Sequence, residues 1–131
     1  MPKSDITYSK LSTIARGFAD SLVYYVNSSS QMPSGMTVRT RDFTEFALEM
    51  TREECSAFLD IAGMIHPGGK NGVRGAIAAH DLGWHFFLAR QRTGIGFENF
   101  SLGEFGQNLD ALALRFPVIT VAVSDGEIDF L

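Results

Sequence analysis

The spacing of apolar residues near the N-terminus constrains the fold most strongly. Leu11, Ile14, Phe18, Leu22 and Val26 recur at steps of three and four residues, which places their side chains on one face of a helix. We therefore expect an amphipathic helix over about residues 9–27. The stretch "NSSSQMPSG" that follows is rich in Asn, Ser, Pro and Gly, which favour turns over helix. It predicts a loop over residues 28–36.

A second helix is indicated by the segment "TREE". Thr51 precedes Glu54 by three residues, the spacing of a capping box in which each side chain satisfies an unpaired backbone N–H. This pattern predicts a helix from about Arg52 to Ile65, with Cys55, Phe58, Leu59 and Ala62 on its buried face. The segment "HPGGKNGVRG" then predicts a break, because five of its ten residues are Gly or Pro. A short helix is expected in "AIAAHDLG".

The remaining chain has the pattern of two hairpins and one helix. The aromatic-rich runs "WHFFLAR" and "IGFENF" flank the short connection "QRTG", which is typical of a β-hairpin. "SLGE" at Ser101–Glu104 is a second capping box and predicts a helix that ends before Pro117. "VITVAV" and "IDFL" flank Asp125-Gly126, a favoured two-residue turn.

The order of these elements predicts an α+β fold. Helices can cover one face of an antiparallel sheet, so we expect a mainly antiparallel sheet of two hairpins packed with about three helices. The length of 131 residues fits a single domain. That domain would span 1–131, with an N-terminal helix over about 9–27, a loop over 28–36 and an α+β body over 44–131.

Composition predicts a globular protein of the cytoplasm. The chain is 45% hydrophobic and 20% charged, near the average for globular proteins. Its longest apolar runs, near residues 84–89 and 117–123, are far shorter than the ~20 residues of a membrane span, so no membrane contact is expected. The start "MPKSDITYSK" lacks the pattern of a signal peptide. The single cysteine, Cys55, cannot form an internal disulfide.

Charge is unevenly distributed along the chain, although the net charge is only −4. Residues 66–92 carry four basic side chains and one acid, whereas residues 93–131 carry six acids and one base. Such asymmetry indicates a surface of two signs that orients a partner, or else an ordinary solvated surface. Direct nucleic-acid binding is not expected, because 11 Lys and Arg in so acidic a chain give no basic footprint.

No catalytic or metal-binding constellation is evident in the sequence. His80 and His85 are five residues apart, so they share a face of neither a helix nor a strand. His66 lies in the expected break. Cys55 lies in a helical pattern, where a buried thiol has little thiolate character. Nucleophile-elbow and phosphate-loop motifs are absent. We therefore expect no catalytic residue, no metal and no cofactor.

The stretch around residues 83–97 is the best candidate for a binding surface. In a strand from Trp84, His85 and Phe87 would share one face, and Arg and aromatic residues are common interface anchors. A strand with one face packed on the helices and a partly covered second face is the alternative. Together with acidic positions of the last third, the candidate partner-binding residues are His85, Phe87, Arg90, Arg92, Glu98, Asp125, Glu127 and Asp129.

This stretch resembles a group of small bacteriophage and prophage proteins without a characterised function. Their pattern is Gly-His-Asp-Phe-Trp-Leu-Thr-Arg, a short turn, Gly-x-Gly-Phe, a helix and a terminal Asp-Gly-x-Ile. The matching positions are Cys55, Phe58, Gly83, Phe86, Leu88, Arg90, Gly94, Gly96, Phe97, Asp125, Gly126 and Ile128. This chain has Trp84-His85 where the group has His-Asp, Phe87 for its Trp, and Thr93 for a His in its turn. The resemblance covers about residues 45–131 and implies a phage or mobile-element origin.

Two functional hypotheses follow. The first is a non-enzymatic phage-type protein that binds and inhibits a bacterial host protein or nucleoprotein complex in the host cytoplasm, as anti-CRISPR and other counter-defence proteins do. The second is a small-molecule or nucleotide-binding module that acts as a signal sponge, built around Phe87, Arg90, Arg92 and the backbone of "HPGGKNG". A homodimer is an additional alternative, because "IDFL" would leave an open strand edge on which only Asp129 discourages pairing.

Overall fold

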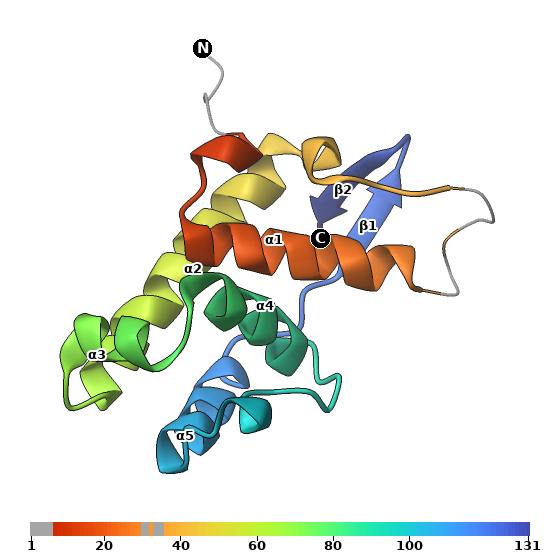
Figure 1. The fold of residues 1–131 in the computed structure, drawn as a ribbon. Coiled ribbons are helices and arrows are strands. Elements are labelled where there is room, and N and C mark those ends of the chain that lie inside the picture. The colour runs from red at the N-terminus through yellow and green to blue at the C-terminus, as the bar shows by residue number, and fades with distance from the viewer. Residues whose placement is uncertain (1–6, 30–31, 33–35) are drawn as a thin grey trace.

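The computed structural model describes residues 7–29, 32 and 36–131, and these residues form a mostly helical α+β fold. The helices are α1 (Thr13–Asn27), α2 (Glu45–Ile65), α3 (Gly69–Ala76), α4 (Ala79–Arg90) and α5 (Glu104–Ala113). The strands β1 (Val121–Ser124) and β2 (Glu127–Phe130) form one antiparallel hairpin. Short 3-10 helices at Tyr8–Lys10, Thr40–Asp42 and Glu98–Phe100 complete the order. Figure 1 shows α3 and the hairpin at opposite ends of the molecule. The expectation of two hairpins and about three helices is therefore wrong.

Helices α1 and α4 cross at very short distance, and glycines make this contact feasible. The N-terminal helix is confirmed as α1, which begins after the N-cap Ser12. A Cβ atom added to Gly83 of α4 would lie 1.8 Å from the carbonyl oxygen of Ile14. One added to Gly17 of α1 would lie 2.1 Å from the carbonyl oxygen of His80. Each helix thus presents a position without a side chain to the backbone of the other.

The hairpin expected around "WHFFLARQRTGIGF" does not exist, because residues 84–90 belong to α4. The buried residues of α4 are Leu82, Gly83, Phe86, Phe87, Ala89 and Arg90, a helical spacing that occupies a wide face. Trp84 and Leu88 are half-buried on the rest of its circumference. A helix that is apolar nearly all round has no amphipathic period, so the strand propensity of its aromatic residues led to the wrong expectation.

Helix α2 is longer than expected and begins without the predicted capping box. Its N-cap is Thr44, whose hydroxyl accepts a hydrogen bond from the Ala47 N–H at 3.2 Å. Thr51 lies inside the helix and donates to the Ala47 carbonyl at 2.8 Å. The expected burial of Cys55, Phe58 and Ala62 is confirmed, whereas Leu59 is half-buried.

Two further boundaries differ from the expectation. The Gly-rich segment predicted as a break contains α3, which begins at Gly69. Helix α5 begins at Glu104 after Gly103, whose φ is 62°, and no side chain caps it, so Ser101 and Glu104 form no capping box. Its end at Ala113, before Pro117, agrees with the prediction. Of the expected loop 28–36, residues 30–31 and 33–35 lie outside the described residues, and Ser29, Met32 and Met36 belong to no helix or strand.

The C-terminal hairpin is confirmed, with Asp125-Gly126 as its turn and Ser124 opposite Glu127. Its β2 edge, however, differs from the open edge that was expected at "IDFL". On the β2 side, Phe43 forms a parallel bridge to Ile128, and the Thr44 N–H donates to the Ile128 carbonyl at 2.8 Å. The edge at "IDFL" is therefore covered, and the exposed edge of the sheet belongs to β1.

The buried apolar residues form one cluster to which all five helices and strand β2 contribute. Phe18 and Phe86 lie near its centre, with ring centroids 5.4 Å apart, and Phe58 stacks on Phe86 at 4.0 Å. In the described part of the chain, no helix has the length and apolar character needed to cross a membrane.

Candidate functional site

The eight residues predicted to bind a partner fall in three separate places. Phe87 and Arg90 lie in the core, with 0% and 1% of their surface exposed. His85, Arg92 and Glu98 surround the turn that follows α4, and Asp125, Glu127 and Asp129 lie on the hairpin. The structure therefore does not bring these residues together on one surface.

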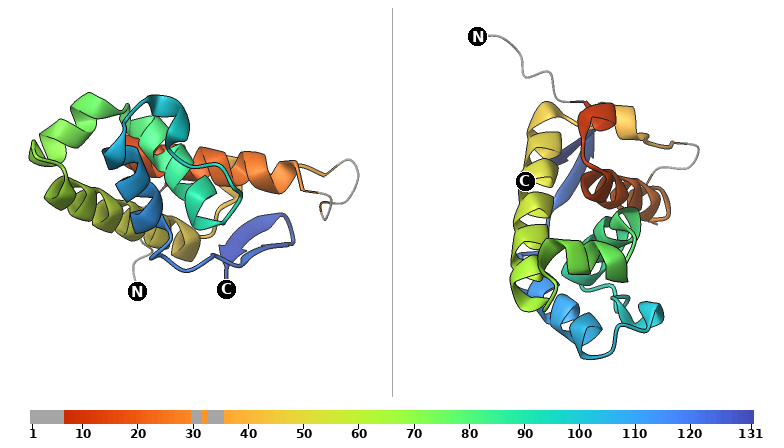
Figure 2. Two further views of the ribbon diagram at one scale, coloured as in Figure 1. Left: turned by 90° about the horizontal axis from the view of Figure 1, so that it is seen from below. Right: turned by 60° about the vertical axis from the view of Figure 1, so that its left-hand side comes forward.

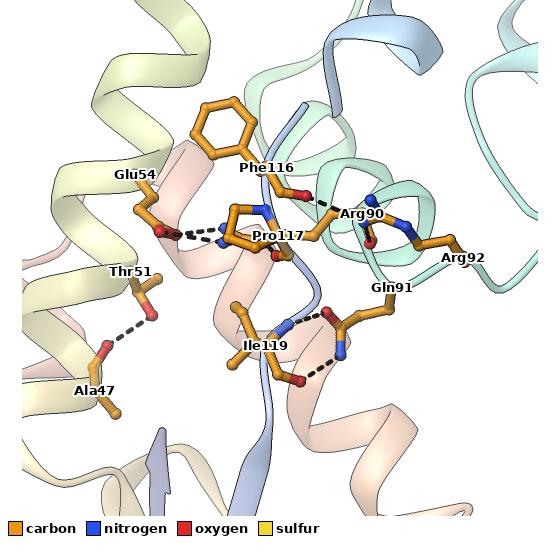
Figure 3. A network of polar contacts seen from close by, with 9 residues as sticks. All are labelled: Ala47, Thr51, Glu54, Arg90, Gln91, Arg92, Phe116, Pro117 and Ile119. Carbon is orange, nitrogen blue, oxygen red and sulfur yellow. Dashed lines mark hydrogen bonds and ion pairs between the residues drawn. The ribbon is translucent and has the colours of Figure 1, made fainter. Parts of the chain in front are cut away.

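Arg90 is an internal ion pair rather than a surface anchor (Figure 3). Its two Nη atoms lie 3.1 Å and 2.5 Å from the carboxylate oxygens of Glu54, and its Nε donates to the Pro117 carbonyl at 2.9 Å. The guanidinium also lies 5.3 Å from the ring centroid of Phe116 and 5.5 Å from that of Phe86. These contacts compensate the burial of the charge and tie α4 to α2 and to the segment after α5.

The two residues that follow α4, Gln91 and Arg92, bind the same segment after α5. The Gln91 side-chain amide donates to the Ile119 carbonyl at 2.9 Å and accepts from the Ile119 N–H at 2.8 Å (Figure 3). Arg92 donates to the carbonyls of Leu114 and Phe116, both at 3.0 Å. Arg92 therefore satisfies carbonyl groups just beyond α5, and its guanidinium is committed to the backbone.

The turn after α4 contains a small pocket of about 310 Å³, which we call the turn pocket. The Glu98 carboxylate accepts from the Gly96 N–H and the Asp110 carboxylate accepts from the Phe97 N–H, both at 2.9 Å. His85 Nδ1 lies 2.8 Å from the Gly96 carbonyl oxygen. Burial raises the pKa of Asp110, the Phe97 N–H opposes this shift, and the neighbouring Glu98 charge adds to it. The acids of this pocket thus stabilise a backbone turn.

A larger groove lies between α1 and the hairpin, and we call it the hairpin groove. Its volume is about 590 Å³. One wall carries Tyr25, Met32 and Met36, and the other carries Val121 and Val123 of β1. Tyr25 and Met36 are 44% and 48% exposed. Figures 1 and 2 show the hairpin beside the C-terminal half of α1. The lining of the groove combines these apolar side chains with polar groups such as the Gln91 amide and the Asp125 carboxylate. Because it also adjoins β1, we take it as a candidate binding surface.

On the groove side, the backbone edge of β1 has no partner among the described residues. The Leu131 N–H donates to the Thr120 carbonyl at 2.9 Å, and hydrogen-bonded pairs alternate with non-bonded pairs in an antiparallel ladder. The N–H and C=O groups of Val121 and Val123 must therefore point away from β2. Ile119 lies two residues before Val121, and its N–H and C=O groups, which also point away from β2, are hydrogen-bonded to the Gln91 side chain. No other described backbone group pairs with those of Val121 and Val123.

The acidic residues of the hairpin have different surroundings. Asp125 lines one end of the hairpin groove, whereas Glu127 is exposed outside it. Asp129 accepts hydrogen bonds from the Thr44 hydroxyl at 2.7 Å and from the Phe130 N–H at 2.9 Å. Only Asp125 therefore adds charge to the groove, and it places a negative charge beside the free edge of β1.

The remaining titratable groups form no catalytic or metal-binding arrangement within the described residues. Cys55 is completely buried, and burial raises the pKa of its thiol. His80 Nε2 lies 2.7 Å from Asp20, and His66 Nδ1 accepts from the Gly68 N–H at 2.9 Å. Among these residues no three His, Cys, Asp or Glu side chains are placed to hold a metal ion.

The groups of the second hypothesis do not converge on a pocket. Phe87 and Arg90 are buried, and Arg92 donates to backbone carbonyl groups just beyond α5. The "HPGGKNG" segment lies at α3, beyond the N-terminal end of α4 (Figure 1). A nucleotide site made of these residues is therefore wrong.

The chain was compared with known families, curated proteins and solved structures. No protein-family model, curated protein or solved structure matches the chain.

Sequence reasoning missed the residues that define the hairpin groove, namely Tyr25, Met32, Met36, Val121 and Val123. Tyr25 lies off the apolar face of the N-terminal helix, and the two methionines flank a Pro in the expected loop. Polarizable, adaptable methionines are frequent at binding surfaces. Their grouping within five residues was the one signal in the sequence that pointed here.

Proposed function

We propose that the protein is a non-enzymatic inhibitor that binds a bacterial host protein through the hairpin groove. The observation that carries this proposal is the edge of β1 beside the hairpin groove, where the backbone groups of Val121 and Val123 have no partner among the described residues. The bacteriophage setting, and counter-defence activity such as that of anti-CRISPR proteins, rest on the resemblance around residues 83–97.

The geometry favours an extended segment of the partner as the occupant. Such a segment adds a strand to an open sheet edge, and its alternate side chains enter the neighbouring groove. Val121 and Val123 together offer two donors and two acceptors, and each hydrogen bond contributes ~0.5–1.5 kcal/mol net. Apolar side chains at alternate positions would cover Tyr25, Met36 and the two valines.

Charge and length restrict the segment further. Asp125 at the end of the groove favours a Lys or Arg at the corresponding end of the partner segment. Gln91 occupies the position opposite Ile119 that the next residue of an added strand would take. The partner strand must therefore end before Ile119, so that pairing is limited to residues 121–124.

A matched pair of methionine variants tests this proposal. Met36→Glu places a charge on the groove wall, and Met64→Glu makes the same change on α2, at a methionine that is 81% exposed and outside the groove. The chain and both variants would be used to capture host proteins from a bacterial lysate. We expect Met64→Glu to retain the captured protein and Met36→Glu to lose it, with equal thermal stability of the two variants.

The charge at the end of the groove has its own test with the captured protein once purified. Asp125→Asn removes the charge but keeps a residue suited to the observed φ of 53°, and Glu127→Gln is its control outside the groove. We expect Asp125→Asn to weaken binding several-fold and Glu127→Gln to leave the affinity unchanged. Capture of no host protein would contradict the inhibitor function, whereas capture that Met36→Glu leaves intact would contradict the groove.

A further inference from the structure

A second concave surface lies between the start of α1, the middle of α2, α3 and the start of α4, at the end of the molecule opposite the hairpin (Figure 1). Its volume is about 660 Å³. Its lining includes four buried apolar side chains, Leu11, Ile14, Ile77 and Leu82, which are 2–5% exposed. This surface therefore has an apolar floor of the kind that small-molecule sites use.

The rim of this cavity, which we call the basic pocket, carries four cationic side chains. Lys10 comes from the 3-10 helix before α1, Arg52 from α2, and Lys70 and Arg74 from α3. All four are exposed at its edge. The protein has a net charge of −4, so a group of four cations from three elements gives this cavity a local sign opposite to that of the molecule.

Acidic side chains neutralise only part of this charge. Asp60, the one acid that lines the pocket, pairs with Lys70, and Glu49 pairs with Arg52 at 2.7 Å. Lys10 and Arg74 form no ion pair with any described acid, and Arg74 has only a 3.5 Å contact with the Asn71 side chain. Two rim cations thus have no ion pair with a described acid. Lys70 and Arg52 are themselves exposed, so an anion can compete with Asp60 and Glu49 for them.

We propose that the basic pocket binds a small phosphorylated molecule with an apolar body, of which nucleotides are the main class. An apolar floor alone would suit an uncharged ligand, and exposed cations alone would suit any anion. Their combination in one cavity of this size selects a molecule with a flat or apolar part and at least two negative charges, which Lys and Arg bind through charge-assisted hydrogen bonds. Ser56, exposed between Arg52 and Asp60, adds a hydroxyl to the lining.

The site does not depend on the hairpin groove or on the proposed inhibitor function. It also differs from the nucleotide site rejected above, because it uses neither Phe87 nor Arg90 nor Arg92. The shared chemistry of a free nucleotide and of a nucleic-acid end is a terminal phosphate beside a base. An experiment must therefore separate these two sources.

Calorimetric titration of the purified chain at low salt tests the proposal with four probes: ADP, adenosine, pyrophosphate and a 5′-phosphorylated ten-nucleotide DNA strand. We expect ADP to bind more tightly than adenosine, which lacks the charges, and than pyrophosphate, which lacks the apolar body. ADP affinity should fall as salt is raised. Tighter binding of the DNA strand than of ADP would contradict a small-molecule site.

A charge-matched pair of double variants locates the site. Lys10→Gln with Arg74→Gln removes the two rim cations without an acidic partner, and Arg41→Gln with Arg115→Gln removes two exposed cations elsewhere. Because two charge-assisted contacts are lost, we expect the first variant to weaken ADP binding about tenfold and the second to weaken it less than about twofold. Equal weakening by both, or no ADP binding at millimolar concentration by the parent chain, would overturn the proposal. Neither result would affect the groove, since no partner protein is present.

Discussion

Substitution of Gly83 by Ala tests the closest contact of the fold. The added Cβ would lie 1.8 Å from the Ile14 carbonyl oxygen and 2.9 Å from the Phe18 nitrogen, whereas ordinary contact begins at 3.4 Å. Both obstacles are backbone atoms of α1, so no side-chain rotation relieves the clash. Helix α4 must instead move away from α1 by roughly 1.5 Å, as expected when an interior is already close-packed.

The cost of this movement follows from what the interface buries. Overpacking a core position costs ~1–3 kcal/mol, and separation of the helices also loosens the contacts of Phe18 with Phe86 and Phe87, whose ring centroids lie 5.4 and 5.3 Å away. We expect Gly83→Ala to lower the free energy of unfolding by about 3–5 kcal/mol, at or above the upper end of the usual range for single substitutions. For a domain of this size, the corresponding loss in Tm is about 10–20 °C.

Urea unfolding followed by circular dichroism measures this change, and Gly75→Ala is the control. Gly75 lies in α3 with no atom within 4 Å of an added Cβ, and Ala is favoured over Gly in helices by ~0.8–1 kcal/mol. The control should therefore be as stable as the parent chain or more so. If the free energy of unfolding of Gly83→Ala is within about 1 kcal/mol of that of the parent chain, α1 and α4 do not cross as described.

Three further predictions concern buried and titrating groups. Arg90→Met should lower the free energy of unfolding in urea by ~3–5 kcal/mol, because it leaves the Glu54 charge unpaired; a loss below about 1 kcal/mol would mean that the pair is weak. Burial, then the hydrogen bond to Asp20, raises the pKa of Tyr8 from 10.0 to about 12. The folded state thus keeps the phenol proton longer than the unfolded state, so stability should fall as pH rises between these values, and Tyr8→Phe should remove that component of a pH series. Cys55 should react with a thiol reagent only as fast as the chain opens, whereas the exposed thiol of Ser56→Cys should react at once; equal rates would refute the burial of Cys55.

Local signals predicted the parts of the fold that local physics determines. The apolar period of residues 11–26 gave α1, because one face of that helix is buried and the other is exposed. Asp125-Gly126 gave the C-terminal hairpin, because both residues adopt the positive φ values, 53° and 78°, that this turn requires. Pro117 correctly marked a position that α5 does not reach.

Tertiary packing decided the parts that the sequence patterns missed. Helix α4 lies between α1 and α5, so its apolar residues show no single face, and its aromatic content indicated a strand instead. The supposed cap residue Thr51 bonds inside a longer helix, and Glu54 pairs with Arg90, 36 residues away. No local sequence pattern predicts whether such a side chain caps a helix, bonds within it or pairs with a distant residue.

The candidate site was hard to predict for a related reason. Arg and aromatic residues are enriched at interfaces, but Phe87 and Arg90 show that the same residue types also fill cores when a partner is available inside the chain. A binding surface made of a strand edge is carried by backbone groups, and these have no sequence signature. The free edge at Val121 and Val123 became evident only once Gln91 and Thr44 were seen to cover the neighbouring edges.

The basic and the acidic stretches of the sequence contribute to different parts of the fold. Of the basic residues between 66 and 92, Arg90 and Arg92 are used internally, whereas Lys70 and Arg74 reach the basic pocket and join Lys10 and Arg52 from other elements. The acidic C-terminal third leaves Asp125 at the hairpin groove. The start of α1 lines the basic pocket and its C-terminal end lines the hairpin groove, and substitutions at distant sites without shared contacts are usually additive. Loss of ADP binding and loss of partner binding should therefore be separable by mutation, and a groove variant that abolished both would point instead to a change in the α1–α4 contact that they share.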